Sequence, residues 1–111
     1  MPDFATYQKQ AGTTAIYPGR GTGNFVYPAL GLAGETGEIC EKIKKVIRDD
    51  GGVVSPEVRG LLAKELGDVL WYLATLASEL GLDLDQIAAD NLAKLSNRKQ
   101  TGRLQGSGDL R

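Results

Sequence analysis

The stretch GLAGETGEICEKIKK, residues 31–45, decides the fold because its apolar residues recur with the period of an α-helix. At about 100° per residue, this spacing predicts a helix with a narrow apolar stripe. Glu35 projects into the stripe, and Glu38 lies at its edge one turn later. A helix that turns carboxylates toward a protein core needs a partner for their charge. The stripe itself consists of Leu32, Ile39, Ile43 and Val46.

The segment KELGDVLWYLATLASEL, residues 64–80, repeats this arrangement on a helix that is apolar nearly all round. Because a buried, unpaired carboxylate is unfavourable, converging acids require a bound cation or retained protons. A divalent metal is the simplest explanation, and a carboxylate beside it can accept a proton from water, which makes Glu35 and Glu38 candidate catalytic groups. The alternative is a set of solvated or salt-bridged surface acids. The candidate metal ligands are Glu35, Glu38, Glu65 and Asp68.

The composition excludes several other kinds of site. The 111-residue chain has no histidine, which excludes Ser-His-Asp and Cys-His catalysis and the usual histidine zinc sites. Oxygen ligands suit Mg²⁺, with Mn²⁺ as the second candidate. Cys40 is the only cysteine, so we expect no disulfide framework and assign it a packing role on its helix. A net charge of −1 without a basic block argues against nucleic acid as a partner.

Neither a membrane span nor a signal peptide is visible in the sequence. No apolar run reaches the roughly 18 residues that a membrane span needs, and the N-terminal residues lack a signal-peptide pattern. We therefore expect a cytoplasmic protein that has no membrane partner.

From the sequence we expect residues 1–111 to form a single all-α domain, with its core at about 24–98 and a flexible, glycine-rich tail at 100–111. The loop at 12–23 contains GRGTG, which has the glycines of a phosphate-binding loop but no preceding strand and no following GK[ST]. It is either a plain connection or a lid that faces substrate. The expected helices occupy residues 2–10, about 28–48, 56–80 and 84–98.

The third helix carries more apolar surface than one small chain can cover, so we expect a bundle of about four helices that assembles as a homodimer or a homotetramer. On the fourth helix, Asn91 interrupts the apolar face, with Lys94 at its edge and Arg98 one turn beyond. A lysine near a carboxylate cluster can bind phosphate, although a solvated lysine and a packing asparagine are the plainer interpretations. Tyr72, one turn after Asp68, is either a ligand-orienting hydroxyl or a core aromatic.

These motifs resemble the MazG-like all-α nucleotide pyrophosphohydrolases. The resemblance covers residues 27–98 and the ending GSGDLR, and it rests on an E-x-x-E on one helix followed by an E-x-x-D on the next. It implies Mg²⁺-dependent hydrolysis of a nucleoside triphosphate between the α and β phosphates, in a homodimer or tetramer. It also implies that the four acids bind the metal and that Tyr72, Asn91 and Lys94 face the nucleotide, and we add Arg98 to the substrate-binding candidates.

Two positions depart from the family pattern, because Gly34 and Lys64 stand where many members have an additional acid. The general base is therefore undefined, and Glu41 is a further candidate that points off the acidic face. The alternative function is a non-catalytic helical oligomer that binds a divalent cation or a nucleotide. In the catalytic interpretation, the tail is expected to fold over bound nucleotide and bring Arg103 or Arg111 to the phosphates.

Overall fold

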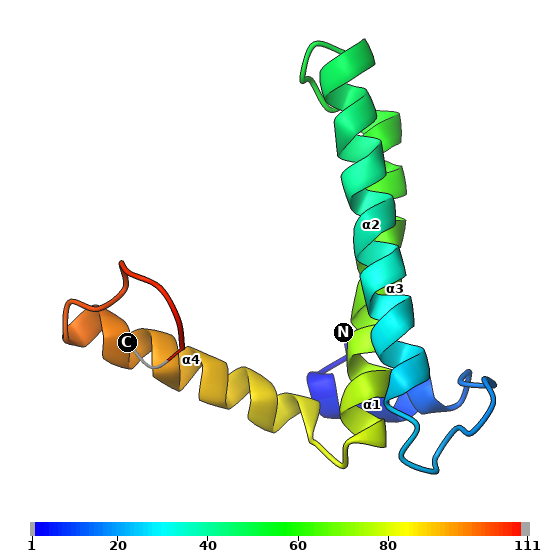
Figure 1. Ribbon diagram of the computed structural model, residues 1–111, viewed down its shortest axis with the longest axis vertical. Helices are drawn as coiled ribbons and strands as arrows, with labels where there is room; N and C mark the ends of the chain where they lie inside the picture. The colour runs from blue at the N-terminus through cyan, green and yellow to red at the C-terminus, as the bar shows by residue number, and fades with distance from the viewer. Residues whose placement is uncertain (1, 110–111) are drawn as a thin grey trace.

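A computed structural model describes residues 2–109, which form four α-helices and no strand (Figure 1). The predicted all-α class is therefore confirmed, and the helix boundaries differ from the predicted ones by only a few residues. The helices are α1 Phe4–Gly12, α2 Val26–Asp49, α3 Pro56–Glu79 and α4 Leu84–Gln100.

Three of the helices begin where a polar side chain caps the first free backbone amides. Asp3 accepts a hydrogen bond from the Thr6 amide at 2.7 Å and so starts α1. Ser55 caps α3 in the same way and is followed by Pro56, whose fixed φ suits a first helical position. The Asp83 carboxylate accepts from the amide of the second residue of α4 at 3.0 Å. Capping residues close in the sequence thus determine where α1, α3 and α4 begin.

The helices α2 and α3 form a long antiparallel hairpin, α1 lies across its base, and α4 projects away from it (Figure 1). A small core of Ala11, Ala74 and Leu84 forms where α1, α3 and α4 meet. The Gln8 side chain fixes this junction, because it donates to the Leu82 carbonyl at 2.8 Å and accepts from the Leu84 amide at 2.9 Å. The described chain alone therefore does not close the bundle expected from its sequence.

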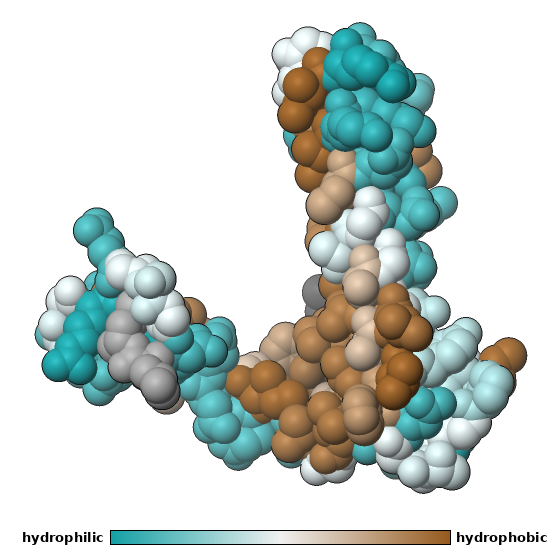
Figure 2. Space-filling view, in the orientation of Figure 1, coloured by the Kyte–Doolittle hydropathy of each residue, from teal (hydrophilic) through white to brown (hydrophobic). Residues whose placement is uncertain are grey.

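Much apolar surface stays uncovered on the single chain. Figure 2 shows hydrophobic residues gathered at the base of the hairpin and along one edge of its upper part. Leu66 and Leu73 of α3 and Leu80, which caps its C-terminus, are seven residues apart and 58%, 37% and 50% exposed. Cys40, which we expected to pack in the core, is exposed because the hairpin is only two helices thick at this level. Within residues 2–109, no helix combines the length and hydrophobicity that a membrane crossing needs.

The described part of the tail, residues 101–109, folds back on α4, and its flexibility stays a prediction. The Arg103 amide donates to the Arg98 carbonyl at 2.7 Å. The buried guanidinium of Arg98 donates to the carbonyl oxygen of Asp109 at 2.9 Å. Arg111, which we expected to reach bound phosphates, lies outside the described residues.

Candidate metal centre and adjoining cavities

Three of the four predicted metal ligands converge where α2 packs against α3. Glu35 of α2 and Glu65 and Asp68 of α3 each offer one carboxylate oxygen, and these oxygens lie within 4.8 Å of one another. Glu35 and Glu65 are half-buried, and Asp68 is exposed. Because each helix repeats about every 3.6 residues, the three-residue spacing on α3 turns both of its acids toward the same face of α2. We call Glu35, Glu65 and Asp68 the acidic cluster.

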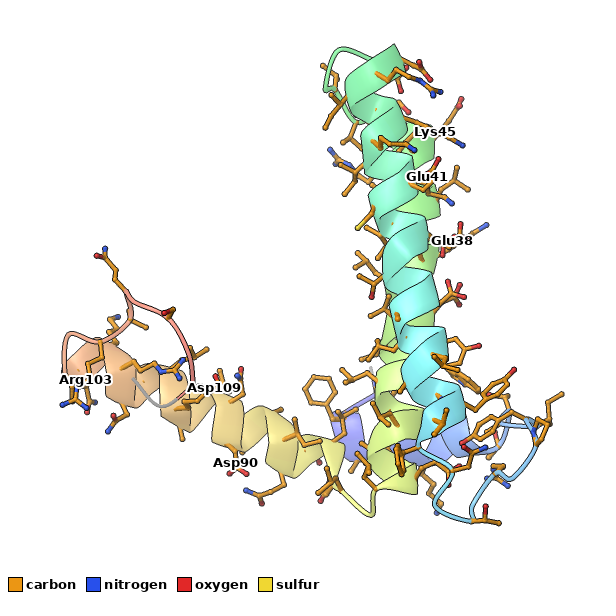
Figure 3. The ribbon with its side chains drawn as sticks, viewed as in Figure 1. Glu38, Glu41, Lys45, Asp90, Arg103 and Asp109 are labelled. Carbon is orange, nitrogen blue, oxygen red and sulfur yellow. The ribbon has the colours of Figure 1, made fainter. Side chains whose placement is uncertain are left out.

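Glu38, the fourth predicted ligand, lies outside the acidic cluster. Its side chain is 60% exposed and projects from α2 into solvent (Figure 3), 4.0 Å from the ammonium group of Lys42. The same ammonium group lies 3.3 Å from Glu65, so Lys42 links the two acids. Glu41 points away from the cluster, as expected, and pairs with Lys44 at 2.9 Å.

The electrostatics of the acidic cluster are those of like charges held close together. A hydrogen bond with the Glu65 carboxyl group raises the pKa of Glu35, and burial and the charge of Asp68 act in the same direction. The pKa of Glu65 is lowered by the same hydrogen bond and by Lys42. Glu35 is therefore the carboxyl group of the cluster whose ionisation the neighbouring negative charges oppose, whereas Lys42 favours the ionised form of Glu65.

The acidic cluster fits a small divalent cation. Mg²⁺ holds oxygen ligands at about 2.0–2.1 Å, which places neighbouring ligand oxygens roughly 3–4 Å apart. Carboxylate oxygens that already lie within 4.8 Å of one another need only small side-chain rotations to reach this spacing. The all-oxygen donor set suits Mg²⁺ or Mn²⁺ and offers no thiolate or imidazole for softer metals.

One cavity adjoins the acidic cluster, and a second cavity shares its aromatic residues Trp71 and Tyr72. The first, of about 350 Å³, is lined by Glu35 and Asp68 together with Thr14, Trp71 and Tyr72. The second, of about 380 Å³, shares these last three residues, includes none of the acids, and is completed by Tyr27 of α2 and by the loop between α1 and α2. Tyr72 thus lines the same cavity as Glu35 and Asp68, and its role toward a ligand stays a prediction. Our sequence interpretation offered the loop as one alternative and did not name Trp71 among the site residues. The loop contributes Thr14, Ile16, Tyr17 and Pro18.

Tyr72 owes its position to a glycine on the neighbouring helix. A Cβ atom on Gly31 of α2 would overlap the ring of Tyr72, so only glycine allows the ring to lie this close to the helix. No such neighbour lies within 4 Å of the corresponding position on Gly37.

We expect Gly31→Ala to destabilise the protein by about 1–3 kcal/mol, because the ring must leave its position or the helices must separate. The control Gly37→Ala has open space and gains helix propensity, so it should stabilise the protein by about 0.5–1 kcal/mol. Urea unfolding followed by circular dichroism measures both changes. Equal effects of the two substitutions would contradict the packing of Gly31 on Tyr72.

The structure does not bring Asn91, Lys94 and Arg98 to the acidic cluster of the same chain, because α4 projects away from the hairpin (Figure 3). Asn91 and Lys94 line a separate cavity of about 310 Å³ on α4. The Lys94 ammonium group lies 3.1 Å from the Asp109 carboxylate, and the Arg98 guanidinium lies 3.5 Å from it. The single carboxylate of Asp109 thus pairs with both of the α4 cations that were predicted to bind phosphate.

The comparisons with known proteins agree with the resemblance seen in the sequence. Residues 28–102 match the family described as the MazG nucleotide pyrophosphohydrolase domain. The chain is also 49% identical over 109 residues to the Gene 37 protein of Mycobacterium phage L5, an alignment that covers 95% of this chain and 96% of that protein. No solved structure matches the chain. The family match includes the whole acidic cluster, Tyr72 and α4.

Proposed function

This chain belongs to the MazG nucleotide pyrophosphohydrolase family, and we propose that it hydrolyses a nucleoside triphosphate to the monophosphate and pyrophosphate with the help of Mg²⁺. The observation that carries this proposal is the convergence of three carboxylates beside a cavity with aromatic walls. Metal-bound phosphates and an aromatic surface for a base are the two needs of nucleotide binding. The cluster and the adjoining cavities provide for both.

Each residue of the site then has a proposed role. Glu35, Glu65 and Asp68 would hold Mg²⁺, with Glu38 as a fourth ligand after rotation about its side-chain bonds. The bound ion would polarise a phosphoryl oxygen and lower the pKa of a water molecule. The carboxylate oxygen of Glu38 that does not bind the ion is the proposed acceptor of the proton that the attacking water loses. Tyr72 would orient the substrate from the cavity wall.

The cations on α4 have a proposed role that requires a second copy of the chain. A triphosphate adds about four negative charges to the acidic cluster, so cations other than Mg²⁺ should help to bind it. Since α4 projects from its own hairpin and Leu92 on it is 67% exposed, we propose that it docks on a neighbouring copy. Asn91, Lys94 and Arg98 would then reach the partner's phosphates once Asp109 is displaced.

Mixing two inactive variants tests whether the copies share a site. We expect Lys94→Ala and Glu35→Gln each to lower activity strongly on its own, because one removes a phosphate-binding cation and the other a metal ligand. If Lys94 serves the neighbouring copy, half the sites of a mixed dimer are intact, and random exchange of subunits should restore about a quarter of wild-type activity. A mixture that shows only the average of the two variants would place Lys94 at the site of its own chain.

The proposed reaction is tested by incubating the protein with a panel of ribo- and deoxyribonucleoside triphosphates and Mg²⁺. We expect the monophosphate and pyrophosphate as products and no turnover when EDTA removes the metal. Formation of a diphosphate and orthophosphate would contradict the proposed cleavage position. Absence of turnover would favour the non-catalytic alternative, for which the ion pair of Lys42 with Glu65 is the supporting observation, because a lysine can replace a metal as the counter-charge.

A further inference from the structure

Glu79 is an acidic residue at the C-terminal end of α3, where an acidic side chain is unfavourable. It is the last residue of α3, where the free carbonyl groups give the helix end a partial negative charge. The last turn of α3 contains no basic residue that would offset this charge. A carboxylate at this position is therefore unfavourable unless donors from elsewhere in the chain satisfy it.

Those donors come from the loop between α1 and α2, residues 13–25. The Gly21 amide lies 3.1 and 3.0 Å from the two carboxylate oxygens of Glu79, and the Gly23 amide lies 3.1 Å from one of them. The Tyr17 hydroxyl donates a further hydrogen bond to the same carboxylate. The hydrogen bond from Tyr17, and then that from the Gly21 amide, hold the pKa of Glu79 below its ordinary value, so the carboxylate stays ionised.

The glycines of the GRGTG segment have a role in this arrangement. Gly21 and Gly23 adopt φ values of 78° and 81°, which side-chain-bearing residues rarely adopt, and their amides turn toward one point. The segment therefore binds an anion, as its resemblance to a phosphate loop suggested, but the anion is the chain's own carboxylate.

The tethered loop forms part of the aromatic wall beside the acidic cluster. Tyr17 is only 8% exposed, and its ring stacks on that of Tyr27, with centroids 4.7 Å apart and planes 9° apart. Both rings line the larger cavity together with Trp71 and Tyr72, and the latter pair also faces the acids. The Trp71 indole donates to the Thr14 hydroxyl at 2.9 Å, which attaches the start of the loop to the same wall.

We propose that Glu79 is a positioning residue for substrate binding: it fastens the 13–25 loop and thereby holds Tyr17 in the wall of the larger cavity, which shares Thr14, Trp71 and Tyr72 with the cavity beside the acidic cluster. The inference rests on the proposed function, because it assigns this wall to the part of the nucleotide that the metal does not bind. Glu79 itself lines a different cavity, with Arg20 and Ser78, and acts on the substrate through Tyr17.

Two variants test the proposal. Glu79→Gln keeps the size of the side chain but removes the charge that three donors share, and Tyr17→Phe removes only the hydroxyl. The matched control is Glu57→Gln, an exposed acid at the opposite end of the same helix. Hydrogen exchange of peptides that cover residues 13–25 measures how firmly the loop is held. Steady-state kinetics with the preferred nucleoside triphosphate measure KM and kcat.

For Glu79→Gln we expect faster exchange in the loop, a KM raised about tenfold and a kcat within about twofold of wild type, because a mobile wall weakens binding without moving the metal ligands. Tyr17→Phe should show the same split to a smaller extent, and Glu57→Gln should show neither change. Faster exchange with an unaltered KM would show that Glu79 holds the loop but does not affect substrate binding. Unaltered exchange would show that Glu79 does not hold the loop. If the wild type hydrolyses no nucleotide, the proposed function fails, while the exchange comparison still decides whether Glu79 fastens the loop.

Discussion

Glu35→Gln should lower kcat/KM for nucleoside triphosphate hydrolysis at least about a hundredfold, because it removes a ligand, and loss of residues that merely support metal ligands already costs 10–100-fold. Glutamine has the size of glutamate and offers one neutral oxygen in place of the charged carboxylate. The acidic cluster would then hold two charges instead of three around the metal.

The same substitution should leave the metal-free fold intact. Glutamine is neutral, so it removes the repulsion from the neighbouring carboxylates, which contributes to the raised pKa of Glu35. Its amide can donate to Glu65, which retains the contact between α2 and α3. We therefore expect the thermal midpoint in EDTA to equal or exceed that of wild type.

Mg²⁺ should change the thermal stability of the wild type and of Glu35→Gln to different extents. A ligand that binds only the folded state raises its stability, so Mg²⁺ should raise the Tm of wild type and not that of Glu35→Gln. Glu41→Gln is the matched control, because Glu41 lies on the same helix, faces solvent and pairs with Lys44. Wild-type turnover by the Glu35 variant, or the same Mg²⁺-induced rise in Tm, would contradict the proposed metal centre.

The sequence predicted the four helices well because their boundaries depend on neighbouring residues. Ser55, Pro56 and Asp83 cap or start their helices through contacts within three positions of themselves. The direction of α4 was not predictable in this way. It depends on the Gln8 side chain, which binds the α3–α4 turn from 74 residues away in the sequence. The fold-back of the tail likewise depends on the hydrogen bond that Arg98 donates to the carbonyl of Asp109, eleven residues later.

In the candidate site, too, the residues positioned by helical spacing were predictable, and those positioned by long-range contacts were not. Glu35, Glu65 and Asp68 converge because helical spacing fixes the directions of their side chains. Glu38 lies at the edge of the acidic face, where a long side chain can turn outward to Lys42, and the periodicity does not decide between these positions. The aromatic wall was missed because Tyr17 reaches it through an irregular loop, and the loop is held by a carboxylate that helical periodicity treats as an ordinary surface residue.

Leu73→Glu should abolish the proposed self-association and leave monomers. Leu66, Leu73 and Leu80 form an exposed apolar row on the side of α3 that the single chain leaves uncovered, and a helix that is apolar on several sides is normally buried on all of them. A carboxylate in the middle of this row would lose apolar contact and would be desolvated on association. We expect the dissociation constant to rise at least about a hundredfold, which corresponds to about 2.8 kcal/mol.

Sedimentation velocity at micromolar concentration measures this change. The matched control is Val53→Glu, because Val53 is 70% exposed in the turn between α2 and α3, outside the apolar row. A wild-type protein that sediments as a compact monomer would contradict the proposed assembly. A Leu73→Glu variant that still assembles would show that the interface lies on another face. If the cations of α4 serve the neighbouring copy, the monomeric variant must also lose nucleotide hydrolysis, even though its acidic cluster and aromatic wall are intact. Raising the protein concentration until the variant associates should then restore activity in parallel with the dimer.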